Sequence, residues 1–237
     1  MKPISLSQFS RVVFFTGAGM SAESGVPTYR GSGGIWAQYR WEECACQDAF
    51  NADPAKVLDF HEQRRGRVLA CAPHAGHLHL AALQAAHPGL SIITQNTDGM
   101  HQRAGARSVI ELHGSLWRMR CAQHGAFEDL AAAEYAHREC GLCGATLRPD
   151  ITWFADSVNA AVFTQAQQLI ARAELFVAVG TSGIVYPAAG MVPAAARSGA
   201  RMIEINPEQT EMSGLFAECA REAAGAALPR MFVFQGS

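Results

Sequence analysis

RVVFFTGAGMSAESG, residues 11–25, begins with an apolar run and continues into a glycine-rich turn. The run predicts a buried strand, and residues 18–25 predict a turn that opens a helix. Gly17, Gly19 and Ala22 satisfy the pattern G-x-G-x-x-A, whose glycines let the backbone turn tightly and approach a pyrophosphate at a helix N-terminus. The pattern indicates a dinucleotide site, but a plain tight turn between strand and helix would carry the same residues.

Composition and charge narrow the class of protein. The chain has 237 residues, of which 49% are hydrophobic and 17% charged, as in globular proteins with a substantial core. The net charge of -2 gives no general attraction to nucleic acid or to acidic membranes. No stretch approaches the roughly 18 apolar residues of a membrane helix, so we expect a cytoplasmic protein whose thiols stay reduced. Its seven cysteines are then metal ligands or buried apolar residues rather than disulfide partners.

Further apolar runs alternate with helical patterns along the chain. They predict strands at residues 11–15, 90–94, 109–110, 175–179 and 201–205. The patterns between them predict helices at residues 53–71, 74–87 and 164–172, and one that ends at 193–198. Continuous apolar strands between helices indicate an α/β protein with a parallel sheet covered on both faces. Residues 31–73 and 116–150 break the alternation and predict a second, smaller lobe.

Polar side chains follow two of these strands at their carboxyl ends, where open α/β sheets bind ligands. TQNTDGMH, residues 94–101, brings Gln95, Asn96 and Asp98 together. His113 lies in ELHGS, residues 111–115, beside a glycine. An Asx-rich turn would explain the first motif and a structural histidine the second, so neither is decisive alone.

Two later strands end in comparable motifs. Gly180, Thr181 and Ser182 offer backbone and hydroxyl donors to a phosphate or a ribose. Asn206 and Glu208 follow the strand at 201–205, and their side chains suit ribose hydroxyls. Each motif is weak alone.

Cys121-x-x-His124 and Cys140-x-x-Cys143 form two ligand pairs. Two-residue spacing lets both side chains of a pair reach one tetrahedral zinc ion, and four ligands leave no open position. The pattern therefore predicts a structural zinc site. Cysteines that serve as plain hydrophobic residues are the alternative, and His124 is the weakest ligand, so another group could complete the site.

The stretch after the glycine turn departs from an ordinary dinucleotide-binding unit, which would continue into a strand that ends in an acidic residue. Here TYRGSGGIW, residues 28–36, has hinge-like glycines, the cation Arg30 and the aromatic Trp36. These residues predict a lid over a dinucleotide that is not used for hydride transfer.

In this order the motifs resemble those of the sirtuins, the NAD-dependent protein lysine deacylases, over nearly the whole chain. The matching stretches are GAGMSAESGVPTYR, TQNTDGMH, LHGS, the 121–143 knuckles, GTSGIVYPAAG and INPE. Four departures occur: Tyr29 stands for the usual Phe, Met100 for Leu, His124 for a cysteine of many members, and WFAD (residues 153–156) for WFGE. None of them removes a catalytic group of the family.

The resemblance implies a Rossmann-like, doubly wound NAD-binding lobe and a smaller lobe made of a helical module and a zinc module. The NAD lobe would comprise residues 1–30, 74–115 and 151–237. The cofactor loop and helical module would take residues 31–73, and the zinc module residues 116–150. By the same resemblance, NAD contacts Gly17, Ala18, Gly19, Ala22, Glu23, Pro27, Tyr29, Arg30, Trp36, Gln95, Asn96, Asp98, Gly180, Thr181, Ser182, Asn206, Glu208 and Ala224.

The resemblance also implies the chemistry. The acyl-lysine carbonyl oxygen attacks the ribose carbon that carries nicotinamide, which leaves. Asn96 and Asp98 orient the nicotinamide and ribose, and His113 is the general base for a ribose hydroxyl. Water then releases lysine and an O-acyl-ADP-ribose. The substrate, an acyl-lysine protein, would bind as an extended peptide between the lobes, against residues that include Val185, Tyr186, Trp153 and Phe154. We expect a monomer.

Within the family, TYRGSGGIW and GTSGIVYPAAG look most like class III, which includes enzymes that remove acidic acyl groups. In class III relatives a helix carries Tyr-x-x-Arg, which binds the carboxylate of succinyl- or malonyl-lysine. Here the motif is His61-x-x-Arg64, which implies a pocket for acetyl and other short neutral acyl groups with residual acidic-acyl activity. A solvated basic helix face is the alternative, because Arg65 and Arg67 are nearby.

Two other functions remain open from the sequence. A protein ADP-ribosyltransferase would displace nicotinamide in the same way but would pass ADP-ribose to a protein side chain. A non-catalytic sensor of NAD or ADP-ribose would release no nicotinamide, and His113, Asn96 and Asp98 together argue against it.

Overall fold

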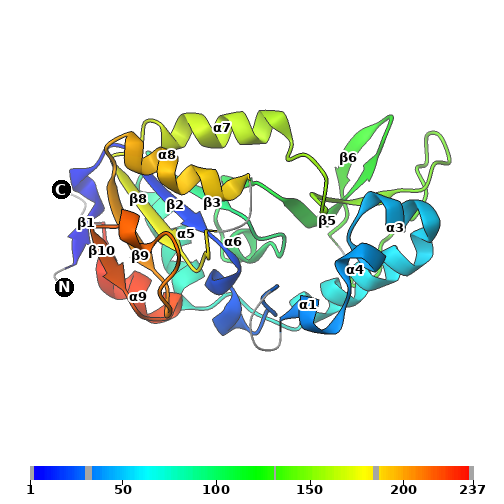
Figure 1. Cartoon of the computed structure of the whole chain (residues 1–237), viewed down its shortest axis with the longest axis horizontal. Helices are drawn as coiled ribbons and strands as arrows, with labels where there is room; N and C mark the ends of the chain where they lie inside the picture. Colours follow the sequence, from blue (N-terminus) through cyan, green and yellow to red (C-terminus); the bar gives the residue numbers. More distant parts are fainter. Residues whose placement is uncertain (1–2, 30–33, 131, 184–186, 235–237) are drawn as a thin grey trace.

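The computed structural model describes residues 3–29, 34–130, 132–183 and 187–234, and these form two lobes (Figure 1). The larger lobe contains a six-stranded parallel sheet with helices on both faces. The smaller lobe combines short helices with a three-stranded antiparallel sheet. No helix of the described ranges is long and apolar enough to cross a membrane.

The large sheet has the strand order β10-β9-β8-β2-β3-β4. The order reverses between β2 and β8, because the chain builds outward from β2 on one side and from β8 on the other. All five contacts between neighbouring strands are parallel. The strands are β2 (Val12–Thr16), β3 (Leu90–Thr94), β4 (Val109–Glu111), β8 (Leu175–Val179), β9 (Arg201–Ile205) and β10 (Glu218–Ala220).

Helices cover both faces of this sheet, as the continuous apolar strands predict. Alternate residues of β2 point to opposite faces: Val12 and Phe14 belong to one buried core with α5 and α9, and Val13 and Phe15 to another with α7 and α8. The four helices are α5 (Ala75–Ala86), α7 (Ala160–Ile170), α8 (Met191–Arg197) and α9 (Ala224–Met231). The same lobe contains α6 (Met100–Arg103) and a parallel pair of short strands, β1 (Ile4–Ser5) and β11 (Phe232–Val233).

The small lobe shares one hydrophobic core between its helices and its sheet. Its longest helix begins where the sequence predicts, because Pro54 occupies the first turn and Asp53 Oδ1 accepts a hydrogen bond from the Lys56 backbone N–H at 3.0 Å. Leu58 of this helix and Leu116 of the sheet belong to the same core. The elements are α1 (Ile35–Gln38), α2 (Trp41–Cys44), α3 (Gln47–Ala52), α4 (Pro54–Leu69), β5 (Gly114–Cys121), β6 (Gly125–Glu128) and β7 (Arg148–Ile151).

Two expectations about local structure are corrected. The glycine turn does not open an α-helix: residues 18–25 form two 3-10 turns, Ala18–Met20 and Ala22–Ser24, and the chain leaves the second through Gly25 with φ +88°. The sequence pattern 121–143 also predicts an irregular segment organised by its cysteine pairs, whereas Cys121 ends a strand that pairs antiparallel with β6. Neither strand has the run of apolar residues that marks the large sheet.

Ala155 is the one non-glycine residue of the described ranges with a positive φ, +66°. A left-handed conformation costs an L-residue roughly 1–2 kcal/mol, whereas glycine adopts it freely. We therefore expect Ala155→Gly to raise the free energy of unfolding by about 0.5–1 kcal/mol in urea denaturation. The matched control is Ala82→Gly on the exposed side of α5, which should lower it by a similar amount. Equal losses in both variants would contradict the prediction.

Candidate active site and metal centre

Three glycines bring the carboxyl ends of β2 and β8 into backbone contact. Gly17 N–H donates to the Val179 carbonyl at 2.9 Å, and Gly19 N–H to the Gly180 carbonyl at 2.8 Å. A Cβ on Gly19 would lie 2.8 Å from Gly180 Cα, and a Cβ on Gly180 only 2.3 Å from the Met20 backbone nitrogen. Because no side chain fits, this contact fixes the edge of the sheet at the point where the strand order reverses.

A cleft of about 720 Å³ opens at this edge, between the lobes. The volume falls in the range of small-molecule sites, about 300–1,000 Å³. The cleft brings together most of the residues that the sequence assigns to the cofactor. Those that line it are Gly17, Ala18, Gly19, Tyr29, Trp36, Gln95, Asn96, Gly180, Thr181, Ser182, Asn206 and Glu208.

His113 lies at the cleft beyond β4 and has a defined tautomer. Its Nδ1 is 2.9 Å from the Gln95 carbonyl oxygen, which can only accept, so Nδ1 carries the proton. Burial lowers the pKa of His113 below 6.5, and the hydrogen bond to Gln95 opposes this only in part. The imidazole is therefore neutral near pH 7, and Nε2 is its unprotonated, basic nitrogen.

Asn96 and Asp98 are both buried, at 5% and 6% exposure. Asn96 Nδ2 donates to the Gly17 carbonyl at 3.0 Å and to Ser21 Oγ at 3.2 Å. Asp98 Oδ1 accepts from the Met100 backbone N–H at 2.9 Å, while burial raises the pKa of the carboxyl group. These bonds fix both side chains before any ligand binds.

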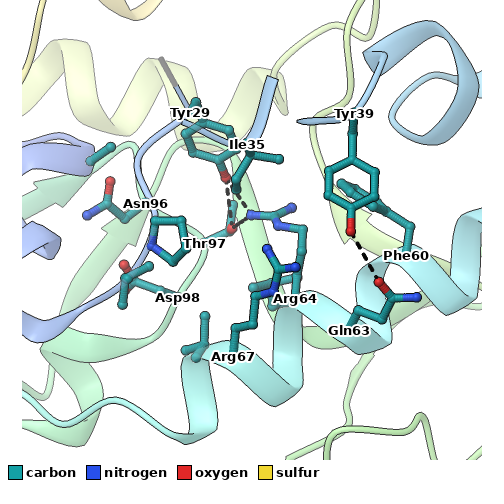
Figure 2. Close-up of a pocket in the computed structure, with 15 residues that line it drawn as sticks. Tyr29, Ile35, Tyr39, Phe60, Gln63, Arg64, Arg67, Asn96, Thr97 and Asp98 are labelled. Atoms are coloured by element: carbon teal, nitrogen blue, oxygen red, sulfur yellow. Dashed lines mark hydrogen bonds between the residues drawn. The ribbon is translucent and has the colours of Figure 1, made fainter. Parts of the chain in front are cut away.

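A smaller cavity adjoins the cleft and is lined by Pro27, Asp98, Arg64 and Arg67 among others (Figure 2). Arg64 lines both cavities. Its Nη2 donates to Tyr29 Oη at 2.7 Å and lies 3.4 Å from Thr97 Oγ1. Figure 2 shows the side chains of Tyr29, Thr97 and Arg64 converging. Asn96 and Asp98 lie on one side of this group, and Tyr39 lies on the other.

His61 is not on a solvated helix face. It is fully buried and lines the cleft, and the indole N–H of Trp153 donates to its Nε2 at 3.0 Å. Burial, with Arg64 and Arg148 adding to the effect, lowers the pKa of His61 well below 6.5. The ring is therefore neutral, and its proton sits on Nδ1 because the indole can only donate. Trp153 and Phe154 also line the cleft.

Several residues named from the sequence lie elsewhere. Ala22, Glu23 and Ala224 line neither cavity, and Glu23 Oε2 instead accepts from the Gly225 backbone N–H at 2.5 Å. Arg30, Val185 and Tyr186 lie outside the described residues.

Two polar residues of the site were missed by the sequence analysis. Ser21, 1% exposed, joins Asn96 to His77 Nε2, which lies 3.3 Å from Ser21 Oγ. Thr97 contacts Arg64 and lines both cavities. Both lie inside the quoted motifs, but only the contacts of their side chains distinguish them from turn residues.

Cys121, His124, Cys140 and Cys143 form a Cys3His metal-ligand set, with all ligand atoms within 4.8 Å of one another. Cys121 Sγ lies 3.7 Å from Cys143 Sγ and 3.5 Å from His124 Nδ1, and Cys140 Sγ also lies 3.5 Å from His124 Nδ1. Zinc bonds of about 2.3 Å to sulfur and 2.0–2.1 Å to nitrogen give tetrahedral edges of roughly 3.6–3.8 Å. The set therefore fits a structural zinc ion, and His124 completes it.

The backbone around this set favours the metal-binding form of the thiol. Hydrogen bonds from the backbone N–H groups of Gln123 and His124 lower the pKa of Cys121 to about 6. The thiolate is the form that coordinates zinc.

A parallel sheet of this order, a cleft at its reversal point and a Cys3His metal-ligand set in the second lobe define a dinucleotide-binding protein of two lobes. The chain belongs to the Sir2 family, whose model matches residues 17–187. The NAD-dependent protein deacylase 2 of Pyrobaculum aerophilum is 42% identical over 227 residues, which cover 95% of this chain and 91% of that protein. The NAD-dependent protein deacylase of Aquifex aeolicus is 39% identical over 223 residues, 93% of each chain.

Solved structures of the family agree with this fold. A Sir2 homologue in complex with NAD is 37% identical, with a TM-score of 0.86 over 94% of this chain and 88% of that chain. A Sir2 homologue mutant with ADP-ribose is 36% identical, with a TM-score of 0.87 over 94% and 90%. A Sir2 mutant with a deacetylated p53 peptide and 3'-O-acetyl ADP-ribose is 27% identical, with a TM-score of 0.82 over 96% and 97%.

We expect Cys140→Ser to abolish metal binding and to lower the free energy of unfolding by about 3 kcal/mol, because metal binding contributes to folding. Metal content by elemental analysis and urea denaturation measure the two effects. Cys219→Ser, which changes a half-buried cysteine outside the ligand set, should leave the metal content unchanged. A wild-type protein that is metal-free and fully active would refute the site.

Proposed function

We propose that this protein is an NAD-dependent protein lysine deacylase that removes acetyl and other short neutral acyl groups and releases nicotinamide and an O-acyl-ADP-ribose. The observation that carries the proposal is His113: a neutral imidazole with a basic Nε2, fixed by Gln95, in a cleft that also presents Asn96. Family membership supports the same activity.

The residues of the chain divide the chemistry between them. NAD supplies an electrophilic ribose carbon and nicotinamide as leaving group. Asn96 and Asp98 orient the nicotinamide end, since both side chains are already held by backbone groups. His113 Nε2 then takes a proton from a ribose hydroxyl, which attacks the acyl carbon, and Gln95 keeps the imidazole in the tautomer that can do so.

The acyl-lysine substrate binds as an extended peptide between the lobes. Thr152, Trp153, Phe154 and Ala155 line the cleft, and so do Ser182 and Pro187 of a second segment. Backbone groups in such a position bind a strand with weak sequence preference. The deacetylated peptide in the complex of the Sir2 mutant described above supports a peptide substrate.

His61 and Arg64 offer a place for a polar atom at the far end of the acyl group. Since the Nδ1 of His61 carries a proton, it and Arg64 Nη1, 3.5 Å away, are two donors that face one another without an acceptor between them. An acyl group that carries an oxygen beyond the carbonyl can supply that acceptor. We infer that a carboxylated acyl group is accepted as a secondary substrate.

An ADP-ribosyltransferase is the second candidate, because it would use the same nicotinamide displacement. Mass spectrometry of reactions with NAD and a panel of acyl-lysine peptides distinguishes the two. A deacylase releases nicotinamide only when an acylated lysine is present. Release without an acylated lysine, with ADP-ribose on protein, would overturn the proposal.

The three clustered thiols of the metal-ligand set suit a compartment that keeps cysteines reduced. On this ground we place the protein in the cytoplasm. We also propose that it acts as a monomer, since both lobes that enclose the cleft come from one chain.

We expect His113→Ala to reduce turnover by roughly 10²-fold or more, the usual contribution of a general base. Steady-state kinetics on an acetyl-lysine peptide measure the loss, and circular dichroism checks the fold. His137→Ala, which changes an exposed histidine, is the matched control and should keep full turnover. A folded His113→Ala enzyme with near-normal turnover would remove His113 from the mechanism.

The pH dependence of kcat/KM should also show whether His113 is the general base. A general base must be unprotonated, so activity falls as the pH drops through its pKa in the folded protein. Because burial lowers the pKa of His113, we expect the acidic limb to lie below pH 6.5. The limb should be absent from the residual activity of His113→Ala. An unchanged limb in that variant would assign it to another group, such as Asp98, whose pKa is raised.

A further inference from the structure

Arg64 lies beside the reacting groups and shares the smaller cavity with Asp98, but it forms no ion pair with any described residue. Its neighbour Arg65 pairs with Asp129 at 2.9 Å, whereas no carboxylate of the described residues forms an ion pair with Arg64. Its guanidinium is instead held by two hydroxyl groups, Tyr29 Oη at 2.7 Å and Thr97 Oγ1 at 3.4 Å. Both hydroxyls meet the same nitrogen, Nη2, as Figure 2 shows.

The choice of nitrogen matters because of the shape of a guanidinium. A carboxylate makes a two-pronged bond with a parallel pair of N–H groups, and arginine offers two such pairs: Nε with Nη2, and Nη1 with Nη2. Both pairs include Nη2. With its two N–H bonds directed at Tyr29 and Thr97, Arg64 retains no complete pair, and Nη1 next to His61 is left for a one-pronged contact.

We propose that the hydroxyl groups of Tyr29 and Thr97 determine acyl specificity, because they occupy Nη2 of Arg64 and so deny a carboxylated acyl group its two-pronged bond. This inference rests on the proposed deacylase function. A neutral acyl group needs no such bond, so the acetyl reaction is the reference for the comparison. Tyr29→Phe or Thr97→Val removes one hydroxyl at nearly constant shape and frees an N–H of Nη2.

The test is the ratio of kcat/KM on matched succinyl- and acetyl-lysine peptides. We expect Tyr29→Phe to raise the succinyl-to-acetyl ratio by about fivefold, the worth of one hydrogen bond, and Thr97→Val to raise it by less, since its contact is longer. Arg64→Met should lower the succinyl-to-acetyl ratio to a small residual value that is still measurable. In the Arg64→Met background, Tyr29→Phe should no longer change the ratio.

Tyr39→Phe is the matched control. Its hydroxyl also lies in the smaller cavity but donates to Gln63 Oε1 at 3.4 Å, away from Arg64 (Figure 2). The ratio should stay at the wild-type value in this variant. A ratio that is unchanged or lowered in both Tyr29→Phe and Thr97→Val, or one that rises equally without Arg64, would overturn the proposal.

A binding measurement separates this outcome from a failure of the proposed function. Fluorescence anisotropy of a labelled succinyl-lysine peptide, without NAD, should report tighter binding to Tyr29→Phe than to the wild type, and no difference between them for the acetyl peptide. If the wild type shows no deacylation but this difference is present, the proposed activity fails and the role of the two hydroxyls stands. If deacylation occurs and the affinities do not differ, the role of the hydroxyls fails alone.

Discussion

The contact between the turn at Gly17–Gly19 and Gly180 is the constraint on which the site depends. The two strand ends meet backbone to backbone, with no room for a Cβ. Two hydrogen bonds connect this contact to the neighbouring strand ends. Thr181 Oγ1 accepts from Gln95 Nε2 at 2.9 Å, and the Gln95 carbonyl accepts from His113. The position of the base is therefore set by the ends of β2, β8 and β3 together, and not by its own strand alone.

The sequence predicts the large sheet well for a physical reason. Strands buried on both faces must be apolar throughout, so residues 90–94, 175–179 and 201–205 agree with β3, β8 and β9 to the residue. Elements that are not buried on both faces do not show such a continuous apolar run, so the sequence does not reveal them in this way. Charged residues interrupt strands β5 and β7, β6 is exposed along its whole length, and α9 contains Pro229.

The same contrast holds for the site. Residues at strand ends were found because the carboxyl ends of parallel strands meet at one edge. The sequence analysis did not identify Ser21 and Thr97 as site residues, because only the side chains that they contact give them a role. Glu23 and Ala224 were assigned to the cofactor by resemblance, but the structure gives Glu23 a bond to the first turn of α9 and puts both outside the cavities. Their role with NAD remains a prediction.

Strand β5 connects the general base of the cleft to the metal-ligand set, two sites with separate roles. It begins at Gly114, directly after His113, and ends at Cys121, a metal ligand. His113 itself is held at the start of this strand by the bond from the Thr152 N–H to its carbonyl, 2.9 Å. Thiol-directed electrophiles or oxidants that remove the metal would thus destabilise β5, the strand that begins directly after the general base His113. In an inhibitor screen such compounds would register as hits without ever competing with either substrate.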